Sequence, residues 1–192
     1  MKKIYITIMG FVLFYISISA QENKKSIYLS GGFGGPYASI SSFKGDLLLS
    51  IGGGGAMLFN NSYYIGGFGQ STSNMLSVKS EIPTYSNSDI QTGYGGLWIG
   101  YILRKKKKFD IDFSIKTACG EVQLNDKTAK QTLYDNVFVL IPEISMNFRI
   151  GSIMKVQLFG NYTAYSKLSL LDYNEKDFSN MAYGIKLSFG WF

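Results

Sequence analysis

Eight charged residues stand out because each lies on the polar face of a segment in which polar and apolar residues alternate. Acids and bases are equally represented among them, so two kinds of chemistry are open. Paired carboxylates can serve as a general acid and a general base. Alternatively, opposite charges can pair and fill a narrow interior, because buried charge must be paired. The balance of sign favours ion pairs. The residues are Asp46, Asp110, Asp112, Lys116, Glu143, Arg149, Lys155 and Lys186.

Residue types used in other catalytic sites are scarce. The chain has 0 His, which removes the commonest general base and the commonest metal ligand. Cys119 is the single cysteine and lies between Ala118 and Gly120, where we interpret it as a small residue of a sheet. A single cysteine also leaves no internal disulfide. We therefore predict no catalytic residue, no cofactor and no metal site, and we expect that the protein is not an enzyme.

Glycine clusters along the chain invite comparison with phosphate-binding loops. A P-loop requires Gly-Lys-Ser/Thr at the start of a helix, and a dinucleotide fingerprint requires a strand, a turn and a helix. Neither context follows the clusters in this sequence. In closely packed strands, glycine instead permits bulges and strong coiling and leaves room for large side chains. The clusters lie at 31–35, 52–55, 66–69 and 93–96.

Eight segments after residue 25 have the features of β-strands, and no segment has the caps and the 3.6-residue period of a helix. The clearest alternation lies between 181 and 191, where apolar residues face small or polar ones. Pro142 interrupts the sixth segment, where we expect a bulge. The expected strands are 26–41, 46–59, 62–75, 90–102, 109–121, 135–149, 153–166 and 177–192.

Alternation alone cannot separate a soluble barrel from a membrane barrel, which turns its apolar face outward. Two further features favour the membrane. The apolar faces carry aromatic residues toward several strand ends, as expected where aromatic girdles meet the lipid interface. The segments are also long enough to cross, since about 9 to 11 tilted residues span the hydrocarbon. The sequence therefore predicts an all-β fold, an eight-stranded antiparallel up-and-down transmembrane β-barrel.

Connections between the expected strands alternate in length. Barrels with both termini in the periplasm have short turns on that side and long loops outside. The connection at 42–45 is the exception, because it should be external but is short. The expected short turns are 60–61, 104–108 and 151–152, and the expected long loops are 76–89, 122–134 and 167–176.

The first 20 residues have the pattern of a signal peptide. Lys2 and Lys3 precede an uncharged, mostly apolar run, and Ser19 and Ala20 supply small residues at the expected cleavage site. We expect residues 1–20 to be removed and 21–192 to form the barrel in the outer membrane of a Gram-negative bacterium. The net charge of +6 is accompanied by no nucleic-acid-binding motif, so we expect no nucleic-acid partner.

Several short segments carry a resemblance to a known family. They are Gly34-Gly35-Pro36, Gly45-Asp46, Gly52-Gly53, Tyr64-Ile65-Gly66-Gly67, Gly93-Tyr94-Gly95-Gly96-Leu97, 138–143 and 186–192. Together they resemble a family of small outer-membrane β-barrel proteins widespread in Bacteroidetes. The resemblance implies the fold and the location, and it transfers no catalytic residue.

The end of the chain resembles the carboxy-terminal signal that the outer-membrane barrel assembly machinery reads. That signal usually ends on an aromatic residue in phase with the lipid face, whereas here Trp191 is in phase and Phe192 lies one residue beyond. The implied partners are this machinery and outer-membrane lipid, and an external partner stays unknown. The residues of the expected signal are Tyr183, Leu187, Phe189, Trp191 and Phe192.

Three functions remain open at this point. The leading hypothesis is a non-enzymatic barrel whose loops mediate surface or envelope interactions. An eight-stranded barrel is just wide enough for its own side chains, so an open channel is not expected. The second is a lipid-modifying membrane enzyme with a carboxylate such as Asp110 or Glu143 as its base. The third is a soluble periplasmic barrel that binds an apolar ligand, with Phe, Leu and Ile inside and the charged rows outside.

Overall fold

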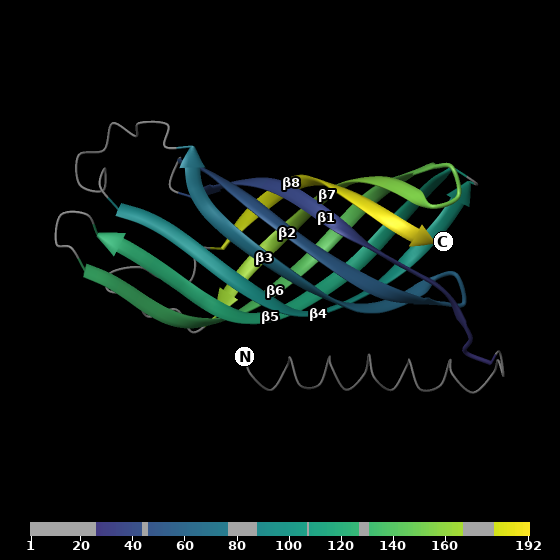
Figure 1. Ribbon diagram of the computed structural model, residues 1–192, viewed down its shortest axis with the longest axis horizontal. Helices are drawn as coiled ribbons and strands as arrows, with labels where there is room; N and C mark the ends of the chain where they lie inside the picture. Colours follow the sequence, from purple (N-terminus) through teal and green to yellow (C-terminus); the bar gives the residue numbers. More distant parts are fainter. Residues whose placement is uncertain (1–25, 44–45, 77–87, 107, 127–130, 167–178) are drawn as a thin grey trace, which may run out of the picture.

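Eight antiparallel strands follow one another around a closed barrel, which confirms the predicted fold (Figure 1). The computed structural model describes residues 26–43, 46–76, 88–106, 108–126, 131–166 and 179–192. No helix among these residues is long and apolar enough to cross a membrane. The strands are β1 (Leu29–Phe43), β2 (Asp46–Phe59), β3 (Tyr63–Leu76), β4 (Ser88–Lys106), β5 (Phe109–Asp126), β6 (Gln131–Ile150), β7 (Met154–Ser166) and β8 (Asn180–Trp191).

The first and last strands close the barrel. Ile40 of β1 pairs with Tyr183 of β8, and Gly34 pairs with Phe189, in an antiparallel ladder. Closure removes the free edges that an open sheet would present. The strands run obliquely to the long axis of the molecule (Figure 1), as closure of a small barrel requires.

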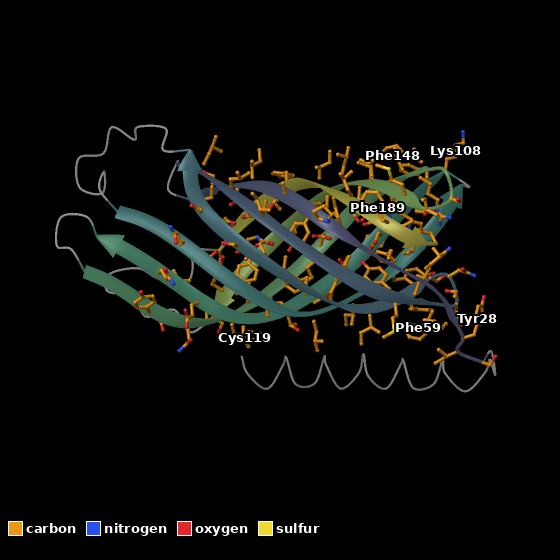
Figure 2. All side chains as sticks on the ribbon, viewed as in Figure 1. Tyr28, Phe59, Lys108, Cys119, Phe148 and Phe189 are labelled. Carbon is orange, nitrogen blue, oxygen red and sulfur yellow. The ribbon has the colours of Figure 1, made fainter. Side chains whose placement is uncertain are left out.

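Polarity across the wall is that of a membrane barrel. On β5, Phe113 and Ile115 point outward and are each 47 % exposed, whereas Asp112 and Lys116 point inward and are 2 % and 1 % exposed. Apolar side chains face outward all around the barrel, and Phe59, Phe148 and Phe189 stand on its outer surface (Figure 2). The inward residues of β1–β4 are mostly apolar, and Phe33, Leu58 and Phe68 belong to a buried apolar cluster. The hypothesis of a soluble barrel with an apolar interior is therefore wrong, because the charged rows face inward.

Tight turns join the strands at one end of the barrel, which we call the turn end. Between β2 and β3, Asn60 and Asn61 have φ values of 51° and 54°. The amide of Ser62 donates to the carbonyl of Phe59 at 3.0 Å. Positive φ at both central residues is typical of the hairpin turn that matches the twist of the strands, and Asn tolerates this conformation. The opposite end, where the longer connections begin, is the loop end.

One predicted loop is wrong. The segment 122–134 was expected to be a long external loop, but β5 and β6 continue their ladder through it to the pair of Asp126 and Gln131. Cross-strand hydrogen bonds prevail over the polar composition of this segment. The other predicted long loops lie almost wholly outside the described residues, as do positions 44–45 of the short first connection, which follows Phe43.

Pro142 causes no bulge, so that expectation is also wrong. In the pairing of β6 with β7, Leu140 faces Ala164 and Glu143 faces Asn161, so the register is the same on both sides of Pro142. Proline has no backbone donor, and the ladder to β7 simply lacks the two pairs at 141 and 142. The strand therefore stays in phase, and the residues beyond Pro142 keep their sides.

Candidate functional site

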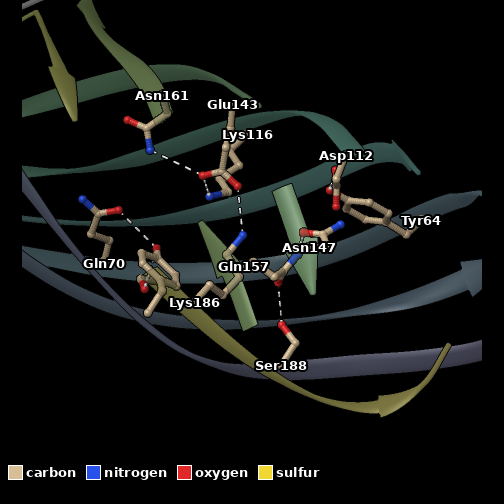
Figure 3. A network of polar contacts seen from close by, with 12 residues as sticks. Tyr64, Gln70, Asp112, Lys116, Glu143, Asn147, Gln157, Asn161, Lys186 and Ser188 are labelled. Carbon is tan, nitrogen blue, oxygen red and sulfur yellow. Dashed lines mark hydrogen bonds and ion pairs between the residues drawn. The ribbon is translucent and has the colours of Figure 1, made fainter. Parts of the chain in front are cut away.

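A buried carboxylate lies at the centre of the barrel interior. Glu143 of β6 accepts hydrogen bonds from Lys116 of β5 at 2.5 Å and from Lys186 of β8 at 2.9 Å (Figure 3). Asn161 of β7 donates a longer bond of 3.4 Å to the same carboxylate. These four residues, the Glu143 cluster, are all buried and join four neighbouring strands.

Nearer the turn end, Arg149 and Asp110 form a second ion pair. The Nε and Nη2 atoms of Arg149 both donate to Oδ2 of Asp110, at 3.0 Å and 2.9 Å. Asp110 is fully buried, whereas Arg149 keeps part of its side chain exposed. A charge-assisted bond of this kind is stronger than a neutral one and holds both side chains in place.

Uncharged polar side chains link the charged groups into a wider network. Gln157 of β7 donates to Asn147 of β6 at 2.7 Å and accepts from Ser188 of β8 at 2.7 Å. The hydroxyl of Tyr64, on β3, reaches over β4 and donates to Asp112 of β5 at 2.7 Å. These bonds satisfy many of the interior polar atoms, while Oδ1 of Asp110, Nδ2 of Asn147 and Oδ1 of Asn161 are buried without a hydrogen-bond partner among the described residues.

Aromatic rings from β1 and β4 cover the lysine ammonium groups, and one of them, Trp98, is paired directly with Lys116. The Nζ atom of Lys116 lies 5.1 Å from the ring centroid of Tyr37 and 5.4 Å from that of Trp98. Lys186 lies still closer to Trp98, at 4.4 Å. Cations within about 6 Å of a ring face are attracted by its quadrupole. The rings therefore solvate the lysines where water is excluded.

Glycines make room for these rings. A Cβ atom at Gly100 would lie 2.3 Å from Cζ of Tyr64, and one at Gly52 would lie 2.5 Å from Cζ of Tyr37. No real Cβ approaches a neighbour so closely, so only glycine fits at these two positions. In both cases the ring belongs to the residue paired with the glycine on the neighbouring strand, so each glycine leaves room for a ring that lies over it along the inner wall.

The structure brings most of the predicted polar residues to the lumen. Asp46 begins β2, but its side chain lies outside those that the structure describes. The candidate bases Asp110 and Glu143 are both occupied by cationic partners. No cluster of His, Cys, Asp and Glu that could hold a metal occurs among the described residues. The residues placed in the interior are Asp110, Asp112, Lys116, Glu143, Arg149, Lys155 and Lys186.

The alternation puts several uncharged members of the network on the same faces as the charged residues, but the predicted set of interior residues left them out. They share the in–out phase of the charged residues on their strands, and that phase is the signal that could have included them. For Tyr64 the in–out phase is not a sufficient signal, because its hydrogen-bond partner Asp112 lies on β5, which does not neighbour β3. The missed residues are Tyr64, Asn147, Gln157, Asn161 and Ser188.

In the segment predicted to be an assembly signal, the last residue faces inward whereas the others face outward. Tyr183, Phe189 and Trp191 are exposed on the outer surface, with Trp191 at 75 %, and Leu187 lies in phase with them. Phe192 instead turns inward, where its ring centroid lies 3.8 Å from Nζ of Lys155. The outward row thus ends at Trp191.

Little space remains inside. A cavity of about 20 Å³ lies toward the loop end, lined by hydroxyl-bearing residues that include Ser50, Thr72 and Tyr165. Such a volume holds about one water molecule. Within the described part of the chain, the arrangement can hold charges and rings in fixed places, and it leaves the carboxylates no room to act on a substrate.

Comparison with known proteins supports the fold. No family model matches the chain, and no curated protein sequence matches it. Among solved structures, the chain is similar to Ail, the attachment invasion locus protein of Yersinia pestis, with 13% identity, a TM-score of 0.53, and coverage of 85% of this chain and 100% of that one.

Two further structures share the architecture. Neisserial surface protein A has 7% identity and a TM-score of 0.59, with coverage of 87% of this chain and 99% of that one. The N-terminal β-barrel domain of OprF from Pseudomonas aeruginosa has 6% identity and a TM-score of 0.53, with coverage of 85% and 98%. At these identities the likeness concerns the fold alone, which is that of small eight-stranded outer-membrane barrels.

Proposed function

We propose that the chain is an integral protein of the outer membrane of a Gram-negative bacterium and that its barrel is a closed, non-enzymatic scaffold. The observation that carries the proposal is the polarity of the wall, with apolar side chains outside and paired charges inside. An apolar surface that surrounds a whole barrel is stable where hydrocarbon covers it. In this proposal, residues 1–20 direct export, and the outward row that ends at Trp191 is read by the barrel assembly machinery.

In this proposal the work of the protein is done at its loop end, in contacts with the envelope or with surfaces outside the cell. The packed lumen and the occupied carboxylates support a role without transport or catalysis. The name of Ail, an attachment invasion locus protein, describes a surface role on a barrel of similar fold. The segments 77–87 and 167–178 are the longest connections between strands and would make such contacts.

Migration in a detergent gel tests the membrane location. Cells that express the full chain are fractionated, and the membrane fraction is run with and without boiling. We expect the protein to require detergent for extraction and to migrate differently in the two samples, because a closed barrel resists detergent until it is heated. A protein that osmotic shock releases without detergent, and that migrates identically in both samples, would contradict the proposal.

Conductance tests the closed lumen. The purified protein is reconstituted in a planar bilayer, and single-channel currents are recorded. We expect no current above that of the bare lipid, because side chains fill the interior. A steady channel current would refute the closed scaffold.

Epitope tags inserted at 77–87 test the site of action, and we expect antibody to bind them on intact cells but not to bind a tag inserted between Gly151 and Ser152.

A further inference from the structure

A groove of about 840 Å³ crosses the outer wall of the barrel from β3 to β8. One side of the groove follows a single row of paired residues through six strands. Each member faces the next across a strand pair, so the row runs perpendicular to the inclined strands and therefore obliquely across the barrel wall. The row consists of Tyr63, Tyr101, Phe113, Ile144, Gly160 and Tyr183.

The depression in the wall has a local cause. Gly160 faces outward between Ile144 and Tyr183 and places no side chain on the surface. Pro142, in the neighbouring row, also faces outward, with a short ring and no pair to β7. Larger side chains on both sides rise above these two residues. The groove is therefore deepest over β6 and β7, toward its Tyr183 end.

Each end of the groove has a pair of tyrosines, one at the turn end of the barrel and the other farther toward the loop end. Tyr63 begins β3 directly after the tight turn at 60–62, and its ring lies 5.0 Å from that of Tyr101. Tyr183 lies near the start of β8, which begins at the loop end, beside Tyr162 of β7. Tyrosine is favoured where an apolar region meets water, because its ring is apolar and its hydroxyl is polar. The groove thus runs from one tyrosine pair to the other.

No charged side chain lines the groove from the outside. Glu143 contributes backbone to its floor, but its carboxylate points inward to Lys116 and Lys186. The outward lining side chains are aromatic, aliphatic, Pro142 and Met181. The groove is also continuous with the exposed apolar surface of the barrel, which includes Leu97, Phe148 and Ile185. Its chemistry therefore suits a hydrocarbon chain along its whole length.

We propose that this groove holds one acyl chain of a bilayer lipid, a proposal that rests on the membrane location argued above. The occupant is a membrane lipid and not a second copy of the chain, because the groove is a narrow oblique depression within the lipid-facing surface, with tyrosines at both ends. The recess at Pro142 and Gly160 holds the acyl chain in place. The lipid bound there is thereby distinguished from the lipids that surround the rest of the barrel.

Photolabelling tests the proposal. The full chain is reconstituted in vesicles of phosphatidylethanolamine and phosphatidylglycerol that contain a trace of phospholipid with a diazirine in its acyl chain. After irradiation, labelled peptides are mapped by mass spectrometry. We expect labelling of the groove residues around Pro142 and Tyr162 to exceed that of Leu97 and Ile185 about threefold or more, a preference that corresponds to only about 0.7 kcal/mol.

Gly160→Leu fills the groove, and Gly69→Leu is its matched control. A Cβ at Gly160 would meet only the Tyr183 ring, at 3.5 Å, which is an ordinary contact, and a Cβ at Gly69 would meet nothing within 4 Å. Both residues face outward, so both variants are expected to fold and to shift on heating. Gly160→Leu should abolish the preferential labelling, and Gly69→Leu should leave it unchanged.

Three other outcomes would overturn the proposal in distinguishable ways. Even labelling of the whole outer surface would refute the groove and leave the membrane location standing. Protection of the groove from label, together with cross-links between copies at Tyr162, would assign the groove to a dimer. A protein that neither inserts into vesicles nor takes up label anywhere would refute the membrane location and the groove together.

Discussion

The strands β1–β4 and β5–β8 line the same lumen with different side chains. From β1–β4, which we call the glycine wall, come the rings of Tyr37, Tyr64 and Trp98 and most of the 22 glycines of the chain. No charged side chain that the structure describes faces inward from this wall. From β5–β8, the charged wall, come the ion pairs of Glu143 and Asp110.

Each wall supplies what the other lacks. The lysines of the charged wall lie against rings of the glycine wall, and Asp112 receives its hydrogen bond from Tyr64 on that wall. The rings reach the lysines because glycines beside them leave space. The contrast teaches that a narrow lumen has two requirements, volume and charge balance, and that this chain assigns them to different strands. Substitutions in the two walls should therefore destabilise the barrel for different reasons.

Glu143→Gln should cause the largest loss, because it leaves Lys116 and Lys186 buried without their shared counter-charge. Removing one partner of a buried ion pair costs about 3–5 kcal/mol. Urea titration of vesicle-embedded protein, followed by the heat-modifiable band, measures the change. Glu121→Gln, on the exposed outer face of β5, should leave the midpoint unchanged. A Glu143→Gln variant within about 0.5 kcal/mol of the parent, the range of neutral surface changes, would show that the charged wall does not depend on this carboxylate.

Gly100→Ala should cause the next largest loss, and it tests the glycine wall. The new Cβ would lie 2.3 Å from the Tyr64 ring, which cannot move away without breaking its bond to Asp112. Overpacking of this kind costs about 1–3 kcal/mol. The same urea titration measures it, with Gly69→Ala as the control, since a Cβ there meets nothing within 4 Å. In a Tyr64→Ala background the cost of Gly100→Ala should disappear, and its persistence would mean that the ring is not the cause.

Ser50→Ala should have a smaller effect, also within the glycine wall. Ser50 and Thr72 share a buried hydrogen bond of 2.7 Å between β2 and β3. Leaving one hydroxyl without its partner costs about 1–3 kcal/mol, and we expect the low end because the nearby small cavity can admit a water. Thr72→Val added to Ser50→Ala should restore part of the loss in the urea midpoint. A further loss in the double variant would show that the two hydroxyls have other roles.

The smallest loss of stability should follow removal of all charges from the Glu143 cluster. The triple variant Lys116→Met, Glu143→Leu, Lys186→Met keeps similar volumes and leaves no charge within the Glu143 cluster. Replacing a buried ion pair with apolar residues is often neutral or stabilising by about 1–4 kcal/mol. We therefore expect an unfolding midpoint at or above that of the parent. A triple variant as unstable as Glu143→Gln would show that the charges themselves, and not their balance, hold the walls together.

The sequence predicted which face of a strand each side chain occupies better than it predicted which side chains contact each other. Period-two alternation put Asp112 and Lys116 on one face, because a strand sends successive side chains to opposite faces whatever its neighbours are. The aromatic strand ends and the strand lengths assigned that face to the interior, where both residues lie. Which cation meets Glu143 depends on register and on curvature around the barrel, and a single strand carries no record of either. The bond between Tyr64 and Asp112 passes over β4 and joins strands that are not neighbours, so no local pattern could reveal it.

Errors in the sequence predictions had physical causes. Residues 122–134 are polar, and the ladder of β5 and β6 nevertheless extends through most of them. Strand pairing can override composition where two antiparallel strands already run in register. Pro142 was expected to shift the register, but a missing donor removes hydrogen bonds without adding a residue.

The position of Glu143 between β5 and β8 has a consequence for the order of assembly. The hairpin of β5 and β6 can bring Lys116 to Glu143 early, since these strands are adjacent in sequence. Lys186 arrives only with the last strand, β8, which also pairs with the free edge of β1 and closes the barrel. A sheet that lacks β8 would thus enter hydrocarbon with unpaired backbone and an incomplete charge cluster, both of which are costly there. Insertion and closure are therefore expected to be concerted, with no long-lived seven-stranded intermediate.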